Sequence, residues 1–469
     1  MTDSASHHDR QPGARVSRWL ARWQQLPLYR RIAAGGVVGV VVGLVLPPLA
    51  MVIERLIAVG HEPAKSEQLE LTVLAGLIAS VELPGKLVLR VLGALAPALV
   101  LVAVVRALMH AELGGSKGWR LVRLLLLNTV VAITIGLLVA NVVRPGSWTT
   151  LSEPPVVAKS AAAGNPLTQF LDNIPKSLFG PLGDDGRVLS VIFLALAFGI
   201  ALRRLKRAPV GNVDQLTLVA FDALVIVLHW VLEVIPLAVF GIITALIAHG
   251  KYRDLAGLGA FVLAVILALL LQTAYYLTRV RLCSWVRPWD LIRGTRDALV
   301  MAFSTGSSTA TMPVTYACLK ERVGLREQSA SMGALVGSNF NNDGTALYEA
   351  MAALFIAQSL GQHLTLVQQL IVVLTSIVAS VGAAGIPEAG LVTMTLVFDA
   401  VGLPKEHIMT LLTVDWFLDR CRTTINVMGD TNVACLLDGK ERELPSSEPP
   451  AASTNDPAVV VPQLAASEY

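Results

Sequence analysis

Long apolar stretches separated by short polar connections dominate the first 286 residues. A helix needs about 20 residues to cross roughly 30 Å of hydrocarbon, and six stretches meet that length. The pattern therefore predicts six membrane-spanning helices, at about 32–58, 84–109, 118–143, 165–202, 215–249 and 255–286. The fourth is interrupted by the sequence FGPLGDDG.

The pattern changes after residue 297, where small and polar residues break each apolar run. The run ALVMAFS meets STGSSTATMP after about ten residues, too few to span a bilayer, which predicts the tip of a re-entrant hairpin. The next span, at about 327–358, is interrupted by SNFNNDG, and IVVLTSIVAS then breaks at VGAAGIPEAG before LVTMTLVFDAVGL. One such break would be interpreted as a helix kink. A hairpin followed by a broken helix, occurring twice, is typical of transporters with inverted repeats.

The last apolar segment carries five polar side chains on one face. Within VDWFLDRCRTTINVMGD they occupy relative positions 0, 4, 7, 11 and 15, which the 3.6-residue helical period places in a narrow stripe. Each charge at the centre of a membrane helix costs roughly 2.5–3.5 kcal/mol, so the stripe must face a bundle interior. A structural polar seam between helices is the alternative. We interpret the stripe as a substrate and ion site formed by Asp415, Asp419, Arg422, Asn426 and Asp430.

Composition and charge also favour a membrane protein. Of the 469 residues, 54% are hydrophobic and only 15% are charged, against about 25% charged in soluble domains. The four cysteines form no CxxC pair and no His-spaced metal pattern, so neither a disulfide nor a zinc site is predicted. Basic residues gather in the N-terminal tail and in the connections at 110–120, 203–207 and 279–296, which places the N-terminus in the cytoplasm. Residues 1–27 contain no signal peptide, and both 1–27 and 438–469 are expected to be disordered cytoplasmic tails.

Four motifs in the second half resemble the glutamate (dicarboxylate/amino acid):cation symporter family, which includes excitatory amino-acid transporters and prokaryotic homologues. They are SSTATMPVT, NNDGTALYEA, GAAGIPEAGLVTM and DWFLDRCRTTINVMGD, in that order within about 297–437; the N-terminal half is similar only in its pattern of spans. The resemblance implies an all-α membrane protein with eight transmembrane helices and two re-entrant helical hairpins in inverted repeats, working by an elevator motion. It also implies a homotrimer in the plasma (inner) membrane. Segments 1, 2, 4 and 5 of residues 28–286 would form its scaffold, and residues 287–437 its transport core.

The resemblance assigns substrate-binding residues as well. The guanidinium of Arg422 would bind the side-chain carboxylate of an acidic amino acid, and Asp419 would bind its amino group. These roles suit a planar bidentate donor and a buried carboxylate. The resemblance implies that five further residues complete the substrate shell: Ser307, Ser308, Thr345, Thr423 and Asn426.

Coupling cations need oxygen ligands, and the resemblance implies three sets of them. The sets are Asp430 with the carbonyls of Gly337, Asn341 and Asn426; Asp343 with Asn341, Asn128 and Thr129; and carbonyls around Ser380, Val381 and Ala383. Glu349 is predicted to carry a proton, because it lies on an otherwise apolar segment where burial disfavours a charged carboxylate. A hydrogen-bonded packing role is the alternative.

Three positions depart from the family's pattern. Asn342 replaces a methionine in NNDGT, the first hairpin reads GSSTA in place of a longer serine run, and Glu388 places a charge near the second hairpin's tip. The amide of Asn342 could ligate a cation through its oxygen or neutralise a carboxylate through its NH₂ group. The coupling ion is therefore Na⁺ or H⁺, with Na⁺ favoured because Asp343 and Asp430 are intact.

The sequence and its resemblance to this family together imply a lipid-embedded symporter, not an enzyme, that imports L-glutamate or L-aspartate on a Na⁺ (or H⁺) gradient, without an organic cofactor or a nucleic-acid partner. Alternatives on the same fold are a C4-dicarboxylate symporter and a neutral amino-acid transporter. Asp419 disfavours the former, because a dicarboxylate has no ammonium group. An anion channel is a further alternative. An intramembrane protease would need paired acids or a serine with a general base, and no histidine lies near Ser307–Ser308 in the sequence.

Overall fold

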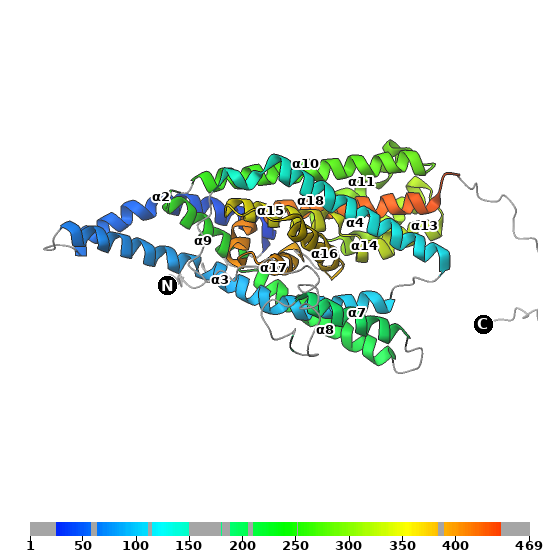
Figure 1. Cartoon of the computed structure of the whole chain (residues 1–469), viewed down its shortest axis with the longest axis horizontal. Helices are drawn as coiled ribbons and strands as arrows, with labels where there is room; N and C mark the ends of the chain where they lie inside the picture. Colours follow the sequence, from blue (N-terminus) through cyan, green and yellow to red (C-terminus); the bar gives the residue numbers. More distant parts are fainter. Residues whose placement is uncertain are drawn as a thin grey trace, which may run out of the picture.

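The structure is a computed structural model that describes residues 25–57, 63–110, 115–149, 180, 188–204, 210–250, 252–382 and 389–441. Every regular element within these ranges is helical (Figure 1). The predicted tails and the FGPLGDDG interruption fall almost entirely outside the described residues. Ala383 and Glu388 also lie outside them.

Seven α-helices and the short 3-10 helix η1 (Pro145–Trp148) are described in the first half. Helix α3 begins at Pro63, well before the predicted start at 84, because 71–83 is also largely apolar and Pro84 and Pro97 are accommodated inside the helix. The predicted span 215–249 is divided at Glu233–Val234, just before Pro236. The seven are α2 (Leu28–Ile57), α3 (Pro63–His110), α4 (Gly115–Val143), α7 (Val188–Arg204), α8 (Val210–Leu232), α9 (Ile235–Ala248) and α10 (Tyr252–Cys283).

A glycine stripe on α2 lets its backbone approach α9 closely. Gly35, Gly39 and Gly43 recur every four residues, which puts them on one helical face. A Cβ atom at Gly39 would lie 2.8 Å from the carbonyl oxygen of Phe240, and one at Gly43 would lie 2.8 Å from that of Thr244. Small residues in such a stripe are how membrane helices pack in the absence of a hydrophobic driving force.

The first predicted hairpin is present, with its turn at Gly306–Ser307. Helix α11 (Pro288–Thr305) ends at Gly306, whose φ of +65° lies in the left-handed region that favours glycine. The second arm is α12 (Ser308–Ala317), which continues into the π-helical turn η2 (Cys318–Val323). The hydroxyl of Ser307 accepts a hydrogen bond from the backbone N–H of Ala310 and so caps α12.

The predicted broken helix follows as three short pieces and one long one. The break falls at Asn341–Asn342, where backbone dihedral angles leave the helical region. After it, α16 (Leu366–Gly382) and α17 (Ala389–Val401) form the arms around the second predicted tip, and η4 (Lys405–His407) leads into α18 (Ile408–Asp438). The pieces of the broken helix are α13 (Glu327–Ser331), η3 (Met332–Val336), α14 (Gly337–Phe340) and α15 (Asp343–Ser359).

Helices distant in sequence lie side by side along the molecule (Figure 1). Helix α4 packs against α15, and α10 and α11 pack against α18. The other first-half helices contact one another more, with α2 and α3 against α9 and α3 against α7 and α8. This packing surrounds α15 and α18 with neighbours, so polar groups on their inner faces are kept from lipid.

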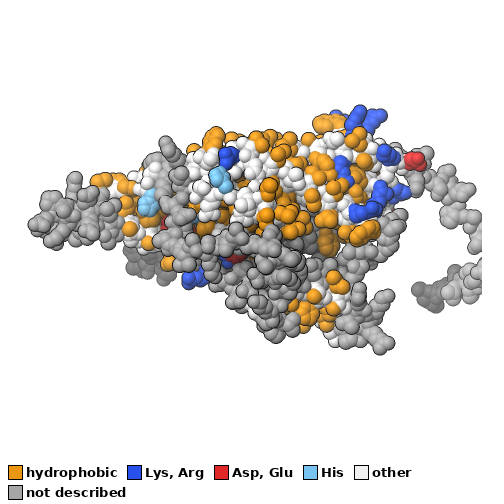
Figure 2. All heavy atoms as spheres, in the orientation of Figure 1, with side chains coloured by type: hydrophobic (Ala, Val, Ile, Leu, Met, Phe, Trp, Pro, Cys, Tyr) orange, Lys and Arg blue, Asp and Glu red, His pale blue; other side chains and the backbone are white. Residues whose placement is uncertain are grey.

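The surface is that of a membrane protein. Four helical stretches among the described residues are long and apolar enough to cross a membrane: 30–52, 118–148, 212–248 and 254–283. Large apolar side chains such as Val142, Leu263 and Val300 are more than 60% exposed, as lipid contact allows. Lys and Arg gather at the end of the molecule where α10 gives way to α11 (Figure 2). The exposed basic residues there include Arg281, Arg287, Arg293, Arg296 and Lys320.

Candidate functional site

The polar stripe predicted on the last span is buried in α18. Asp415, Arg422, Asn426 and Asp430 are each at most 4% exposed, and the side chain of Asp419 is 13% exposed. The stripe therefore faces the interior of the bundle, as its free-energy cost in lipid requires.

Arg422 is the centre of a buried charge cluster. Its Nη1 lies 2.8 Å from Oδ1 of Asp415 and its Nη2 lies 2.7 Å from Oδ1 of Asp419. Its guanidinium carbon lies 4.0 Å from the centre of the Tyr348 ring on α15. Its Nε has no hydrogen-bond partner in the described part of the chain. Two carboxylates on one guanidinium leave the cluster with one excess negative charge.

Both hairpins approach this cluster. A Cβ atom at Gly306, in the tip of the first hairpin, would lie 3.1 Å from Oδ2 of Asp419. On the second hairpin, a Cβ atom at Gly390 would lie 2.8 Å from Nη2 of Arg422. Glycine at these two positions leaves the charged groups room between the hairpins.

The other predicted substrate residues make contacts of their own on the first hairpin, the broken helix and α18. Ser307 caps α12, and the hydroxyl of Ser308 donates to the carbonyl of Ser338 at 3.3 Å. The amide of Asn426 donates to the hydroxyl of Thr345 at 3.3 Å, one turn of α18 beyond Arg422. Thr423, which follows Arg422 in the sequence, is also buried.

The first predicted cation set is brought together at the helix break. The amide nitrogen of Asn341 donates to Oδ1 of Asp430 at 3.1 Å and to the carbonyl of Asn426 at 3.0 Å. A Cβ atom at Gly337 would lie 2.6 Å from the same oxygen of Asp430. The amide oxygen of Asn341 is buried and has no partner among the described residues. It could therefore ligate a cation together with the carboxylate of Asp430.

The second predicted set centres on Asp343 and includes residues that the sequence analysis missed. The hydroxyl of Thr129 donates to Oδ1 of Asp343 at 2.7 Å, and the hydroxyl of Tyr276 donates to its other oxygen. Asn128 lies nearby, where its side-chain oxygen accepts from Arg279. Asn341, also predicted for this set, donates its amide N–H to Asp430, and its amide oxygen has no partner among the described residues.

A signal for these additional residues was present in the sixth predicted span. Gln272, Tyr276 and Arg279 follow one another at spacings of four and three, which puts three polar groups on one face of the apolar helix α10. The helical periodicity that identified the polar face of α18 would also have identified this polar face of α10.

The third predicted set is only partly described. The carbonyl of Ser380 accepts a hydrogen bond of 2.8 Å from the side-chain amide of Asn342. Val381 lies within α16 but its side chain is not described, and Ala383 is outside the described residues. In the described structure the NH₂ group of Asn342 contacts a carbonyl rather than a carboxylate, and its oxygen accepts from Asn426 at 3.2 Å.

Glu349 is fully buried on α15. The hydroxyl of Thr393, on the second arm of the second hairpin, donates to one of its carboxyl oxygens. The predicted proton carrier therefore connects the broken helix to the hairpin that covers Arg422.

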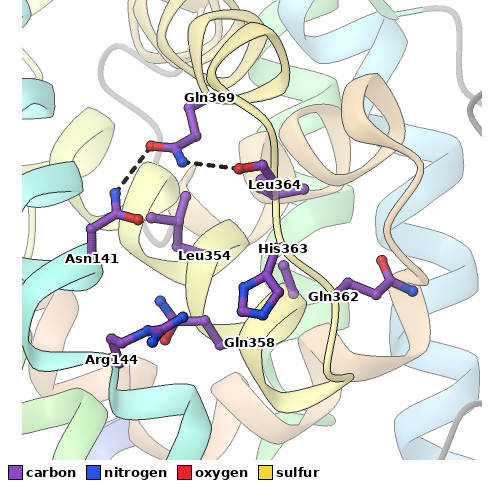
Figure 3. Close-up of a pocket in the computed structure, with 9 residues that line it drawn as sticks. Asn141, Arg144, Leu354, Gln358, Gln362, His363, Leu364 and Gln369 are labelled. Carbon is purple, nitrogen blue, oxygen red and sulfur yellow. Dashed lines mark hydrogen bonds between the residues drawn. The ribbon is translucent and has the colours of Figure 1, made fainter. Parts of the chain in front are cut away.

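A small pocket lies elsewhere, at the ends of α4 and α15 and the start of α16. Its volume is about 40 Å³, far below the roughly 300–1,000 Å³ of ligand sites. Arg144, Gln358 and His363 point toward one another there, and the amide of Asn141 donates to Gln369 at 3.0 Å (Figure 3). No predicted site residue lines it, so it is separate from the Arg422 cluster.

Comparison with known proteins connects this arrangement to transporters. The family model described as "Sodium:dicarboxylate symporter family" matches residues 28–440. The chain is 31% identical over 428 residues to excitatory amino acid transporter 1 of Ambystoma tigrinum, covering 78% of each sequence. It is 36% identical over 282 residues to the human excitatory amino acid transporter 1 (59% of this chain, 50% of the relative). Human excitatory amino acid transporter 2 is 39% identical over 253 residues (53% and 44%).

Proposed function

The chain belongs to the sodium:dicarboxylate symporter family, and from that premise we propose that it is a secondary active symporter importing L-glutamate or L-aspartate. Membership makes it a multi-pass membrane transporter, not an enzyme, that is coupled to a cation. The observation that carries the substrate proposal is the buried guanidinium of Arg422 held between Asp415 and Asp419.

An acidic amino acid fits this cluster by exchange of partners. Its ammonium group takes the carboxylate of Asp419, and its side-chain carboxylate takes the N–H groups of Arg422 that Asp419 releases. In this exchange Arg422, Asp419 and the two substrate groups that bind them each keep a partner, which is the condition for burying these charges. The substrate also brings one net negative charge to a cluster that already has one in excess. Entry of a cation with the substrate offsets that charge, which supports coupling.

The cation sites support Na⁺ as the coupling ion. The unpartnered amide oxygen of Asn341, the carboxylate of Asp430 and the nearby carbonyl of Asn426 are hard oxygen ligands. Asp343 provides a second buried carboxylate, with hydroxyl groups of Thr129 and Tyr276 beside it. Among the described residues no three His, Cys, Asp or Glu side chains are grouped for a metal, so backbone and amide oxygens would supply the remaining ligands.

The proposed architecture has eight spans and two re-entrant hairpins. The spans are α2, α3, α4, α7, α8 with α9, α10, the broken segment from α13 to α15, and α18. The helices α2, α3, α7, α8 and α9 would form the scaffold, and α4 and α10 would move with residues 287–437 in an elevator motion, as a trimer. The exposed basic end in Figure 2 would face the cytoplasm with both termini, in the plasma (inner) membrane.

A C4-dicarboxylate symporter is the second candidate, favoured by the description of the matching family. Asp419 argues against it. A dicarboxylate brings no ammonium group, so the carboxylate of Asp419 would lose Arg422 and gain no partner. A buried charge left unpaired in this way costs roughly 3–5 kcal/mol.

The test is uptake of labelled aspartate into proteoliposomes with Na⁺, H⁺ and K⁺ gradients varied one at a time. We expect uptake that follows an inward Na⁺ gradient, saturates, and shows counterflow against unlabelled glutamate. Competition by succinate stronger than by glutamate would favour the dicarboxylate alternative. Flux of anions without saturable counterflow would identify a channel instead.

A further inference from the structure

Asn342 links three elements through both ends of its side-chain amide. Its NH₂ group donates to the carbonyl of Ser380 at 2.8 Å, and its oxygen accepts from the amide of Asn426 at 3.2 Å. The side chain is 5% exposed and Ser380 is 1% exposed. The break before α15 is thus tied both to the second hairpin and to α18.

The carbonyl of Ser380 has a particular electrostatic character. Ser380 lies in the last described turn of α16 (Leu366–Gly382), and the carbonyls in the last turn of a helix lack partners within it. The aligned peptide dipoles place partial negative charge at this end of the helix. Such carbonyls are satisfied by an N–H donor or by a cation. In this chain the side-chain amide of Asn342 provides the donor.

We infer that the amide of Asn342 takes the place of a coupling cation at the C-terminal end of α16, so that the chain moves one cation fewer per substrate than it would with an apolar side chain there. The inference rests on the proposed sodium symport. A cation would have to displace the N–H group from Ser380 and leave it buried without an acceptor. That penalty corresponds to roughly a fivefold to hundredfold loss of cation affinity.

The carboxylates near the break are arranged to accept cations elsewhere. Asp430 is bonded to Asn341, and Asp343 is bonded to Thr129 and Tyr276. Neither is hydrogen-bonded to Asn342 or Ser380 in the described structure. A cation at Ser380 would therefore be held by neutral groups in direct competition with a tethered neutral donor. At Asp430, by contrast, a cation would find a carboxylate and the amide oxygen of Asn341, which has no partner among the described residues.

The experiment measures the dissociation constant of aspartate for the purified full chain in detergent as Na⁺ is replaced by choline at constant ionic strength. The variants are Asn342→Met, which removes the amide, and Asn342→Asp, which keeps its shape and its acceptor but cannot donate to Ser380. Mass action makes the logarithmic slope equal to the number of sodium ions that bind with substrate. We expect this slope to be larger by about one in both variants than in wild type. A tenfold rise in Na⁺ would then lower the aspartate dissociation constant about tenfold more in the variants than in wild type.

Asn339→Met is the matched control, because Asn339 lies on α14 and donates to the carbonyl of Leu335, away from Ser380. It should keep the wild-type slope. Equal slopes in wild type and both Asn342 variants would overturn the inference while leaving sodium symport intact. Binding that ignores Na⁺ in all four proteins would contradict the proposed coupling, and the inference with it. If a variant binds no substrate, the Na⁺ dependence of its melting temperature supplies the same comparison of slopes.

Discussion

The guanidinium of Arg422 stacks on the ring of Tyr348, with 4.0 Å between the guanidinium carbon and the ring centre. Both side chains are fully buried. An aromatic face attracts a cation without neutralising it, so Tyr348 holds the guanidinium in position while its N–H groups remain available to carboxylates. This arrangement favours the proposed exchange of Asp419 for a substrate carboxylate, because Tyr348 would keep the guanidinium in place when the ion pair opens.

Replacement of Arg422 by Ala should abolish transport of acidic substrates. The distal carboxylate of the substrate would be left unpaired in a buried site, which costs roughly 2–5 kcal/mol. We expect loss of aspartate and glutamate uptake in proteoliposomes and a gain of small neutral amino acids such as serine. Tyr348→Phe, which keeps the ring, is the control and should retain acidic specificity. Near-wild-type glutamate affinity in Arg422→Ala would refute the assignment of Arg422.

Replacement of Glu349 by Gln should separate net uptake from exchange. A carboxyl group that moves inward protonated with the substrate makes wild-type uptake rise as the outside pH falls. The glutamine amide cannot release a proton, so we expect net uptake to lose this pH dependence while exchange of internal for external aspartate survives. Thr393→Val removes only the hydroxyl that bonds Glu349 and should keep a pH-dependent uptake. An unchanged pH profile in Glu349→Gln would favour the packing role.

Much of the second half could be predicted from the sequence because its signals are local. Glycine and serine at a helix turn predicted the tip at Gly306–Ser307, and the polar run predicted the break at Asn341–Asn342. The stripe on α18 followed from helical periodicity alone. The family resemblance carried by four motifs is confirmed by the match over residues 28–440.

Pairings between distant segments could not be predicted in the same way. The ties of Asn342 to Ser380 and of Tyr276 to Asp343 depend on how helices pack, which a single sequence does not reveal. The long reach of α3 was missed because its first turns carry several charges among apolar residues. The open amide oxygen of Asn341 beside Asp430 likewise follows from packing and could not be found from the sequence.

Replacement of Tyr276 by Phe should make stability depend more strongly on Na⁺. The hydroxyl of Tyr276 donates to Asp343, and a hydrogen bond to a charged group contributes about 1.5–3 kcal/mol. Without that donor, burying the charged carboxylate of Asp343 without a cation costs more free energy, so a bound cation stabilises the protein more. We expect a larger difference in melting temperature between Na⁺ and choline buffers than in wild type. Tyr275→Phe is the control, because that ring stacks under Arg279, and equal differences in all three proteins would exclude this role.

Arg420 should hold the first hairpin against α18. Its Nη1 donates to the carbonyl of Phe303 at 2.9 Å and to that of Ser304, and both lie in the last turn of α11. A cation at the C-terminal end of a helix contributes roughly 0.3–1 kcal/mol at exposed sites and up to about 2 kcal/mol when partly buried. Replacement of Arg420 by Met keeps most of the apolar stem but removes both hydrogen bonds and the charge.

We therefore expect Arg420→Met to open the first hairpin more often. A loss of about 1 kcal/mol makes local opening about fivefold more frequent, and amide hydrogen exchange of residues 302–308 should quicken by the same factor. Aspartate should also dissociate faster, because the tip at Gly306 lies against Asp419. Arg296→Met is the matched control. Arg296 lies on α11, the helix whose last turn Arg420 contacts; its side chain is 74% exposed and pairs only with Asp297 among the ion pairs of the described residues. If exchange in the hairpin quickens equally in both variants, the effect belongs to lost surface charge, and Arg420 does not hold the hairpin.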